Sequence, residues 1–151
     1  LVPAVLLSAA RKAQGNNLDV LKADLQLAKE RAGNMPGGSC GYLGACGACV
    51  GVGIFLSLMT DTTPLSPKTW SFVNMATANA LQSIASFGGP RCCKRCTWLS
   101  ILSVKEQIES VLNLTMPFTD SPRCGFSDIN DLCIRVKCPF FAEGQHQKKH
   151  V

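Results

Sequence analysis

The sequence has little histidine, and its two histidines, His146 and His150, both lie near the C-terminal end. No Ser-His-Asp arrangement can be assembled in the rest of the chain, and the shortage of histidine weighs against a zinc site. The i, i+4 spacing of the two histidines would allow them to share a metal ion. We instead interpret residues 143–151 as a polar, flexible tail, because polar chain ends commonly fray.

The chain also lacks the signatures of several common function classes. It contains neither a Walker phosphate-binding loop nor a dinucleotide-binding fingerprint. Its basic residues are spread over several segments with few aromatic residues among them, so nucleic-acid binding is not expected. The net charge of +5 is modest and leaves room for an anionic partner or cofactor.

Secretion and membrane insertion are not expected either. The apolar stretch Leu1–Ala10 has no basic segment before it, so it does not resemble a signal peptide. The apolar run from Leu43 to Met59 is short for a membrane span and begins among cysteines and glycines. An odd cysteine count argues against a simple disulfide framework. We therefore expect a reducing, cytoplasmic location in which thiols act as ligands or reagents.

No segment alternates apolar and polar residues, so the sequence predicts an all-α fold in one domain over residues 1–142. The apolar run is expected to form a buried central helix, with Gly47 and Gly51 allowing a close helix neighbour. A chain that begins at Leu1 is expected to be part of a longer protein, whose remainder could supply a partner domain. About five helices are predicted, at Pro3–Gln14, from a cap at Asn17 to Arg31, within Leu43–Met59, from Ser66 to about Phe87, and from the second cysteine group to Leu112.

Nine cysteines, gathered in three tight groups, are the most informative feature of the sequence. Long cysteine-free stretches separate the groups, which indicates that thiolates from distant parts of the chain are brought together to hold something or to react. The predicted metal ligands are Cys40, Cys46 and Cys49, then Cys92, Cys93 and Cys96, then Cys124, Cys133 and Cys138.

The first two groups lie where helices are predicted to begin. Cys46 and Cys49 fall on one helix face, and the free amides and positive dipole at a helix N-terminus favour thiolate over thiol. The glycines among the first group would let backbone amides approach sulfur closely. In the second group, Cys92 and Cys93 are adjacent and must point apart.

Basic residues surround the second group, and Arg91, Lys94 and Arg95 are the predicted cofactor-binding residues. They could lower cysteine pKa values, neutralise a bound cluster or grip an anionic substrate, and the sequence does not separate these roles.

The third group ends in Cys138-Pro139, the dipeptide that closes the bacterial ferredoxin motif. Together the groups favour one or two four-iron, four-sulfur clusters over zinc, because structural zinc usually takes two tight cysteine pairs. A zinc-stabilised interaction domain is the first alternative. The second is a thiol enzyme in which nearby positive charge activates Cys92 or Cys93 for redox or sulfur-transfer chemistry. The sequence leaves open whether the chain is an enzyme.

Three stretches carry a resemblance that extends from about Pro3 to Phe141. They are Cys40-Gly-Tyr-Leu-Gly-Ala-Cys46-Gly-Ala-Cys49, Gly88-Gly-Pro-Arg-Cys-Cys-Lys-Arg95, and Cys124-Gly-Phe-Ser-Asp-Ile-Asn-Asp-Leu-Cys133 with Cys138-Pro-Phe-Phe141. They resemble an uncharacterised cysteine-rich family of methanogenic archaea and anaerobic bacteria, some members of which carry a methyltransferase-like or radical-enzyme domain. The resemblance implies an anaerobic cytoplasmic setting and brings no established reaction.

These observations lead to one functional expectation. We expect a domain that uses iron–sulfur clusters for electron transfer, or for sulfur or substrate handling. It would serve a redox or methyl-transfer enzyme, either as a partner protein or as a fused domain.

Overall fold

The structure, a computed structural model, describes residues 1–15, 18–119 and 121–142. Within these ranges it has no β-strand, only an isolated bridge between Cys124 and Phe141, so the predicted all-α class is confirmed. The predicted cap at Asn17 and the predicted tail with its two histidines lie outside the described residues. The helices are α1 (Val2–Ala13), α2 (Leu18–Gly33), α3 (Ser39–Tyr42), α4 (Gly47–Met59), α5 (Trp70–Ala85), α6 (Cys93–Ser103) and α7 (Lys105–Leu112), followed by the short 3₁₀ helix η1 (Arg135–Lys137).

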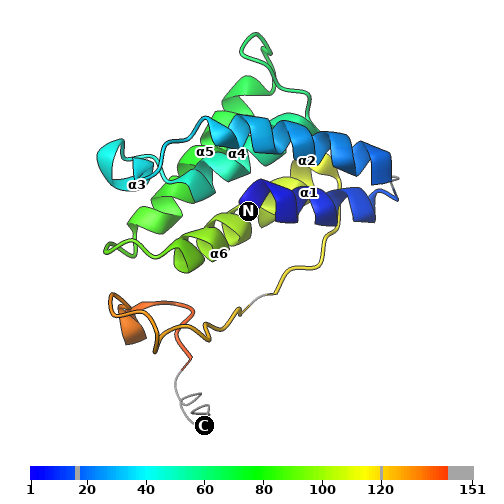
Figure 1. Ribbon diagram of the computed structural model, residues 1–151. Coiled ribbons are helices and arrows are strands. Elements are labelled where there is room, and N and C mark those ends of the chain that lie inside the picture. The colour runs from blue at the N-terminus through cyan, green and yellow to red at the C-terminus, as the bar shows by residue number, and fades with distance from the viewer. Residues whose placement is uncertain (16–17, 120, 143–151) are drawn as a thin grey trace.

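Helix α4 is the central helix of the bundle, as the sequence predicted. It contacts α1, α2, α5 and α6, and these helices surround it in Figure 1. Val52, Phe55 and Leu56 have no exposed surface. A helix that is apolar on every side is stable only when neighbours cover every side, and this explains its position. None of the helices in the described ranges combines the length and apolar character that a membrane span requires.

Two glycines of α4 allow the neighbouring helices to approach closely. A Cβ atom at Gly51 would lie 2.9 Å from Pro3 Cδ in α1, and one at Gly53 would collide with Thr77 Oγ1 in α5. The prediction for Gly51 is confirmed, whereas that for Gly47 is wrong, because a Cβ there would meet nothing within 4 Å. Gly47 opens the helix beside a cysteine-lined pocket, away from the helix crossings.

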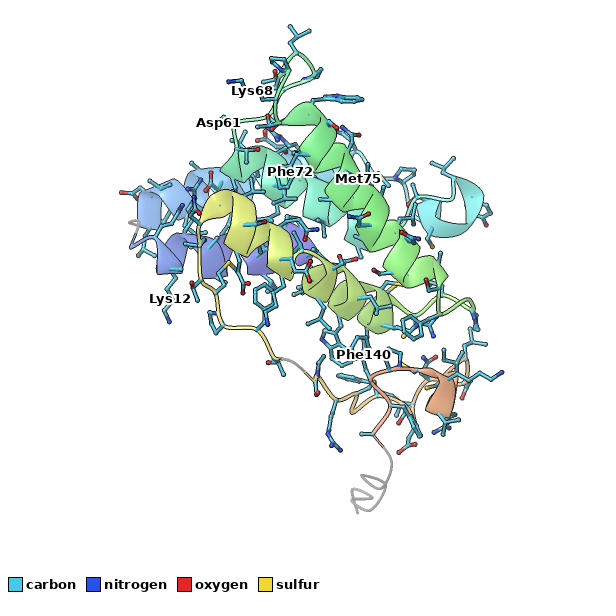
Figure 2. The ribbon with its side chains drawn as sticks, turned by 180° about the vertical axis from the view of Figure 1, so that it is seen from behind. Lys12, Asp61, Lys68, Phe72, Met75 and Phe140 are labelled. Atoms are coloured by element: carbon cyan, nitrogen blue, oxygen red, sulfur yellow. The ribbon has the colours of Figure 1, made fainter. Side chains whose placement is uncertain are left out.

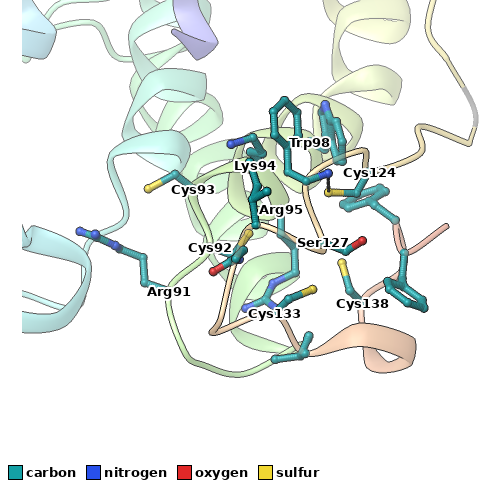
Figure 3. Close-up of a pocket in the computed structure, with 16 residues that line it drawn as sticks. Arg91, Cys92, Cys93, Lys94, Arg95, Trp98, Cys124, Ser127, Cys133 and Cys138 are labelled. Carbon is teal, nitrogen blue, oxygen red and sulfur yellow. Dashed lines mark hydrogen bonds between the residues drawn. The ribbon is translucent and has the colours of Figure 1, made fainter. Parts of the chain in front are cut away.

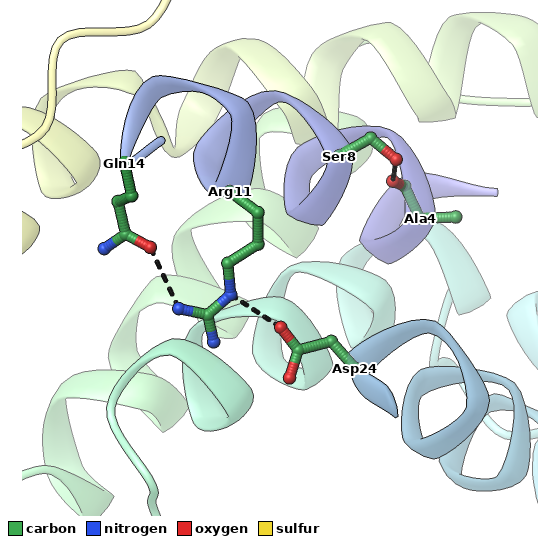
Figure 4. Close-up of polar contacts among 5 residues, drawn as sticks. All are labelled: Ala4, Ser8, Arg11, Gln14 and Asp24. Atoms are coloured by element: carbon green, nitrogen blue, oxygen red, sulfur yellow. Dashed lines mark hydrogen bonds and ion pairs between the residues drawn. The ribbon is translucent and has the colours of Figure 1, made fainter. Parts of the chain in front are cut away.

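A charged pair joins α1 to α2 (Figure 4). Arg11 Nε donates to Asp24 Oδ2 at 2.6 Å, and Arg11 Nη1 donates to Gln14 Oε1 at 2.9 Å. The two charged side chains are only 16% and 13% exposed, so solvent screens their attraction weakly. The ion pair therefore helps to hold α2 against α1. Asp24 and Ala28 are the buried residues of α2.

Helix α5 begins later than predicted. Ser66 was expected to cap a helix starting at Pro67, but its hydroxyl accepts a hydrogen bond from the Thr63 amide at 2.9 Å, within the preceding turn. Thr69 is the N-cap residue instead, and the helix starts at Trp70. Within α5, Phe72 packs against the core while Met75 is exposed, and both are labelled in Figure 2.

The predicted fifth helix is divided at Val104 into α6 and α7. Ser103 Oγ donates to the Ser100 carbonyl at 2.9 Å, a side-chain contact that competes with the helical hydrogen-bond ladder and bends helices. The buried Val104 then serves as the N-cap of α7. As a result, α6 is a short helix whose N-terminal end carries the second cysteine group.

The C-terminal segment, residues 121–142, lies against the N-terminal half of α6 (Figures 1 and 2). Phe140 is buried and meets the Trp98 ring edge-on, with the ring centroids 5.0 Å apart. The Cys124 amide donates to the Phe140 carbonyl at 2.7 Å, and this hydrogen bond joins the beginning of the segment to its end. Turns and the helix η1 make up this segment, for which the sequence predicts short helices or turns around the third cysteine group.

Candidate functional site

A pocket of about 300 Å³ lies between the start of α6 and the C-terminal segment. Figure 3 shows the side chains of Cys92, Cys133 and Cys138 turned toward a common space, while Cys93 points away from it. Cys124 also lines this pocket, and Cys93 borders it although its side chain is turned away. We call Cys92, Cys124, Cys133 and Cys138 site 1.

The chain positions Cys92 at the junction between a turn and a helix. Gly88 adopts a left-handed conformation with φ of +66°, and Cys92 is the extended N-cap residue of α6, with φ of −134°. Cys93 is the first residue of the helix proper. This change of backbone conformation between adjacent residues sends their side chains in different directions, as the sequence predicted.

Backbone amides donate to two of the sulfur atoms in the C-terminal segment. The Phe126 amide lies 3.4 Å from Cys124 Sγ, and the Arg135 amide lies 3.4 Å from Cys133 Sγ. Arg135 adopts φ of +50°, a conformation that favours glycine, and this turn aims its amide at the sulfur. Hydrogen bonds of this kind favour the thiolate. Sequence reasoning expected them among the glycines of the first group, whereas the structure places these two in the third.

Arg95 is a buried cation beside site 1. It is 3% exposed and lines the same pocket. Its Nη2 donates to the carbonyls of Gly88 and Pro90 at 2.8 and 3.0 Å, whereas its Nε has no hydrogen-bond partner. Within the described part of the chain, no carboxylate forms an ion pair with it. A buried charge without a counter-charge is costly, so this position favours an anion in the pocket.

The other two basic residues predicted at the site line the same pocket. Lys94 Nζ lies 3.9 Å from the centre of the Phe126 ring, and this contact holds the ammonium group at the pocket wall. Arg91 lines this pocket and also a second one. The structure therefore gathers the predicted cofactor-binding residues Arg91, Lys94 and Arg95 around the thiols.

The second pocket, of about 250 Å³, lies among α3, the start of α4 and the start of α6. Cys46 is the N-cap residue of α4, so the prediction that the first group lies at a helix start is confirmed. We call the four cysteines that line this pocket, Cys40, Cys46, Cys93 and Cys96, site 2.

Cys49 lies behind site 2 in the hydrophobic core and is 1% exposed. Burial, with a smaller contribution from the nearby Cys46, raises the pKa of the Cys49 thiol to about 12, and the Ser100 hydroxyl opposes the shift. Burial likewise raises the pKa of Cys96 to about 11, with Cys46 again adding to the shift and Arg95 opposing it. At neutral pH the metal-free protein therefore keeps both thiols protonated.

The three cysteine groups thus meet at two places. The second group is divided. Cys92 lines the first pocket with the third group, Cys96 lines the second pocket with Cys40 and Cys46, and Cys93 borders both pockets. All nine cysteines are free thiols. Across the described ranges, no three His, Cys, Asp or Glu side chains are placed so that they could hold a single metal ion. The cysteines line pockets and do not crowd around one point.

Comparison with known proteins places the chain in a family. A family model described as a family of unknown function (DUF5714) matches residues 1–141. The chain belongs to this family. The match includes all nine cysteines, so sites 1 and 2 both lie inside the DUF5714 region. Neither the curated proteins nor the solved structures gave a match.

Sequence reasoning missed the apolar walls of the DUF5714 pocket. The pocket is lined by Trp98 from α6 and by Phe126 and Phe140 from the C-terminal segment. Trp98 falls within the predicted fifth helix, and the sequence assigns it no role at the site. The one local signal was the position of Phe140 directly after Cys138-Pro139.

Proposed function

We propose that this DUF5714 domain binds an iron–sulfur cluster at site 1 and uses it for one-electron transfer. The observation that carries the proposal is the pocket itself, where four cysteines from two distant parts of the chain meet beside a buried arginine. Four cysteine thiolates are the usual ligand set of a four-iron, four-sulfur cluster. The sequence Cys138-Pro139 at the end of the third group agrees with this chemistry.

The charge distribution around site 1 supports the proposal. A cluster held by four thiolates carries net negative charge, and Arg95 supplies a buried positive charge that has no carboxylate partner in the described residues. Arg91 and Lys94 add further positive charge at the pocket wall. The bound cluster would satisfy Arg95, and Arg95 would stabilise the cluster, most of all in its reduced state.

The spread of the cysteines favours a cluster over zinc. Around one tetrahedral zinc ion the four sulfur atoms must lie about 3.8 Å apart, because each Zn–S bond is about 2.3 Å. The described side chains form no set tight enough for a single ion. In a four-iron cluster each cysteine binds a different iron, so the sulfur atoms stand further apart. A pocket lined by cysteines accommodates a cluster of this kind.

The surroundings of site 1 favour electron transfer over catalysis at the cluster. With four protein ligands no iron remains open for substrate, whereas sulfur or substrate handling would need an open position. Amides that donate to Cys124 and Cys133, and the walls formed by Trp98 and Phe140, are the features that set a cluster's reduction potential. We place the domain in an anaerobic cytoplasm, where it would deliver electrons to a redox or methyl-transfer enzyme.

Anaerobic purification followed by cluster reconstitution tests the proposal. We expect a brown protein that contains iron and acid-labile sulfide and loses visible absorbance when dithionite reduces it. The double variant C133S/C138S should lose the site 1 iron and sulfide while keeping its helical circular dichroism. A colourless wild-type protein that contains stoichiometric zinc and no sulfide would replace the proposal with the zinc-stabilised alternative.

A further inference from the structure

The side chains of the adjacent residues Cys92 and Cys93 point in different directions, although both residues line the site 1 pocket. Cys92 points into the site 1 pocket, together with Cys133 and Cys138 (Figure 3). Cys93 points away from that space and lines the second pocket with Cys40, Cys46 and Cys96. The start of α6 is therefore a junction between two groups of thiols.

We propose that Cys40, Cys46, Cys93 and Cys96 bind a second iron–sulfur cluster, and that the adjacent ligands Cys92 and Cys93 couple the two clusters electronically. The inference rests on the proposed function of site 1. It assigns four cysteines to each cluster and leaves one cysteine out.

The construction of site 2 resembles that of site 1. Its ligands come from three elements: Cys40 from α3, Cys46 from the N-cap of α4, and Cys93 and Cys96 from the first turn of α6. No side chain caps the N-terminus of α4, so its first amides and its positive dipole end face the pocket that Cys46 and Gly47 line. Arg91 lines both pockets and adds positive charge beside them.

Cys49 is the one cysteine of the nine that is assigned to neither cluster. It lies in the hydrophobic core and does not line the second pocket. We therefore assign it a packing role, which corrects the sequence-based prediction that all nine cysteines are ligands. This assignment makes Cys49 the matched control for every ligand variant.

The shared junction has a consequence for electron flow. Ligands on consecutive residues are joined by one peptide unit, whose Cα atoms are about 3.8 Å apart. One electron can pass from the reduced cluster of one site to the oxidised cluster of the other, so that the two clusters exchange oxidation states without proton or ligand transfer. The domain would then hold two electrons, one on each cluster.

Iron analysis and electron paramagnetic resonance spectroscopy of reconstituted protein test this inference. Wild type should contain about eight irons and eight sulfides per chain, two four-iron clusters. Its spectrum after full reduction by dithionite should show splitting or broadening from two interacting paramagnetic clusters. C40S/C46S should fall to about half the iron and give a simple, uncoupled spectrum, and C124S/C133S should do the same. C49A should keep the full iron content and the coupled spectrum.

The outcomes separate this inference from the proposal for site 1. If wild type holds four irons and only C124S/C133S loses them, the second site is wrong while site 1 stands. If wild type holds eight irons but the reduced spectrum shows no interaction, the electronic coupling is wrong. If wild type binds no iron and no sulfide, the proposed function itself fails. Circular dichroism of each variant confirms that the helices are retained.

Discussion

At the scale of single residues, Arg95 connects the fold to the chemistry. Its guanidinium group holds the turn before α6 through the carbonyls of Gly88 and Pro90, and so it positions Cys92 at the pocket. The same group is buried, and its Nε lacks a partner among the described residues. A residue needed only to hold the turn could do so from the surface. Its burial next to four thiols indicates an electrostatic role as well.

We expect the substitution Arg95→Gln to lower the midpoint potential of the site 1 cluster. Loss of a buried positive charge destabilises the reduced, more negative cluster, by an amount on the order of 100 mV for a charge a few ångströms away at an effective dielectric constant near 20. Potentiometric titration followed by visible absorbance measures the shift. Lys94→Gln is the control, and its shift should be smaller because solvent screens that exposed ammonium group.

Arg95→Lys separates charge from structure. The lysine keeps the positive charge but cannot reproduce the paired hydrogen bonds of the guanidinium group. A near-normal midpoint potential in Arg95→Lys supports the electrostatic role. Equal shifts in the Gln and Lys variants would instead show that Arg95 acts only by holding the turn.

The raised pKa values of Cys49 and Cys96 predict how the stability of the metal-free protein depends on pH. The unfolded chain loses these protons near the ordinary value of 9.0, whereas the folded protein keeps them until about 12 and about 11. Between these values the folded state binds more protons than the unfolded state, so the free energy of unfolding falls as pH rises. We expect the stability that these two buried thiols contribute to the reduced, metal-free protein to be complete below about pH 9.0 and to be lost progressively above it.

Urea unfolding of the metal-free protein at pH 8 and pH 10, conditions on either side of the ordinary thiol pKa, measures this loss. Cys49→Ala removes one of the two responsible thiols, so its stability should depend less steeply on pH. A slope identical to that of wild type would assign the effect to other groups, such as lysines.

At the scale of helices, α4 shows which features the sequence could predict. Its uniform apolar composition was enough to place it at the centre of the bundle. The boundaries of α5 and α6 were not predictable from apolar periodicity, because the hydroxyls of Ser66 and Ser103 bond to nearby backbone groups and shift them. One such side-chain hydrogen bond contributes about 1 kcal/mol to stability, and tertiary packing can outweigh a contribution of that size.

The close crossing of α1 and α4 leads to a matched pair of substitutions. We expect Gly51→Ala to lower the free energy of unfolding by about 1–3 kcal/mol, because its Cβ would press on Val2 and Pro3 in α1. Gly47→Ala adds the same methyl group where nothing lies within 4 Å, so it should be neutral or stabilising. Equal effects of the two changes in urea denaturation would contradict the close approach at Gly51.

At the scale of the whole molecule, the sequence indicated which residues gather at the site better than how they are arranged. The cysteines at helix starts and the basic residues beside them were recognisable as candidates, and the structure places them around two pockets. The division between sites 1 and 2 was not predictable. It depends on the abrupt conformational change at Cys92 and on the packing of residues 121–142 against α6, which involves contacts between segments distant in sequence.

The C-terminal segment supplies three of the four site 1 cysteines, and Phe140 holds it against α6 through Trp98. Phe140 lies outside the main core cluster. We therefore expect Phe140→Ala to release this segment and to remove the site 1 cluster, about half of the bound iron, while the helical circular dichroism persists. Hydrogen exchange should accelerate in residues 121–142 and remain slow in α4. Leu132→Ala is the control, because Leu132 is 61% exposed in the same segment and does not line the site 1 pocket, so its loss should leave the site 1 iron in place. If Phe140→Ala retained all of its iron, the cysteines and the bound cluster would hold the segment against α6 without the aromatic contact.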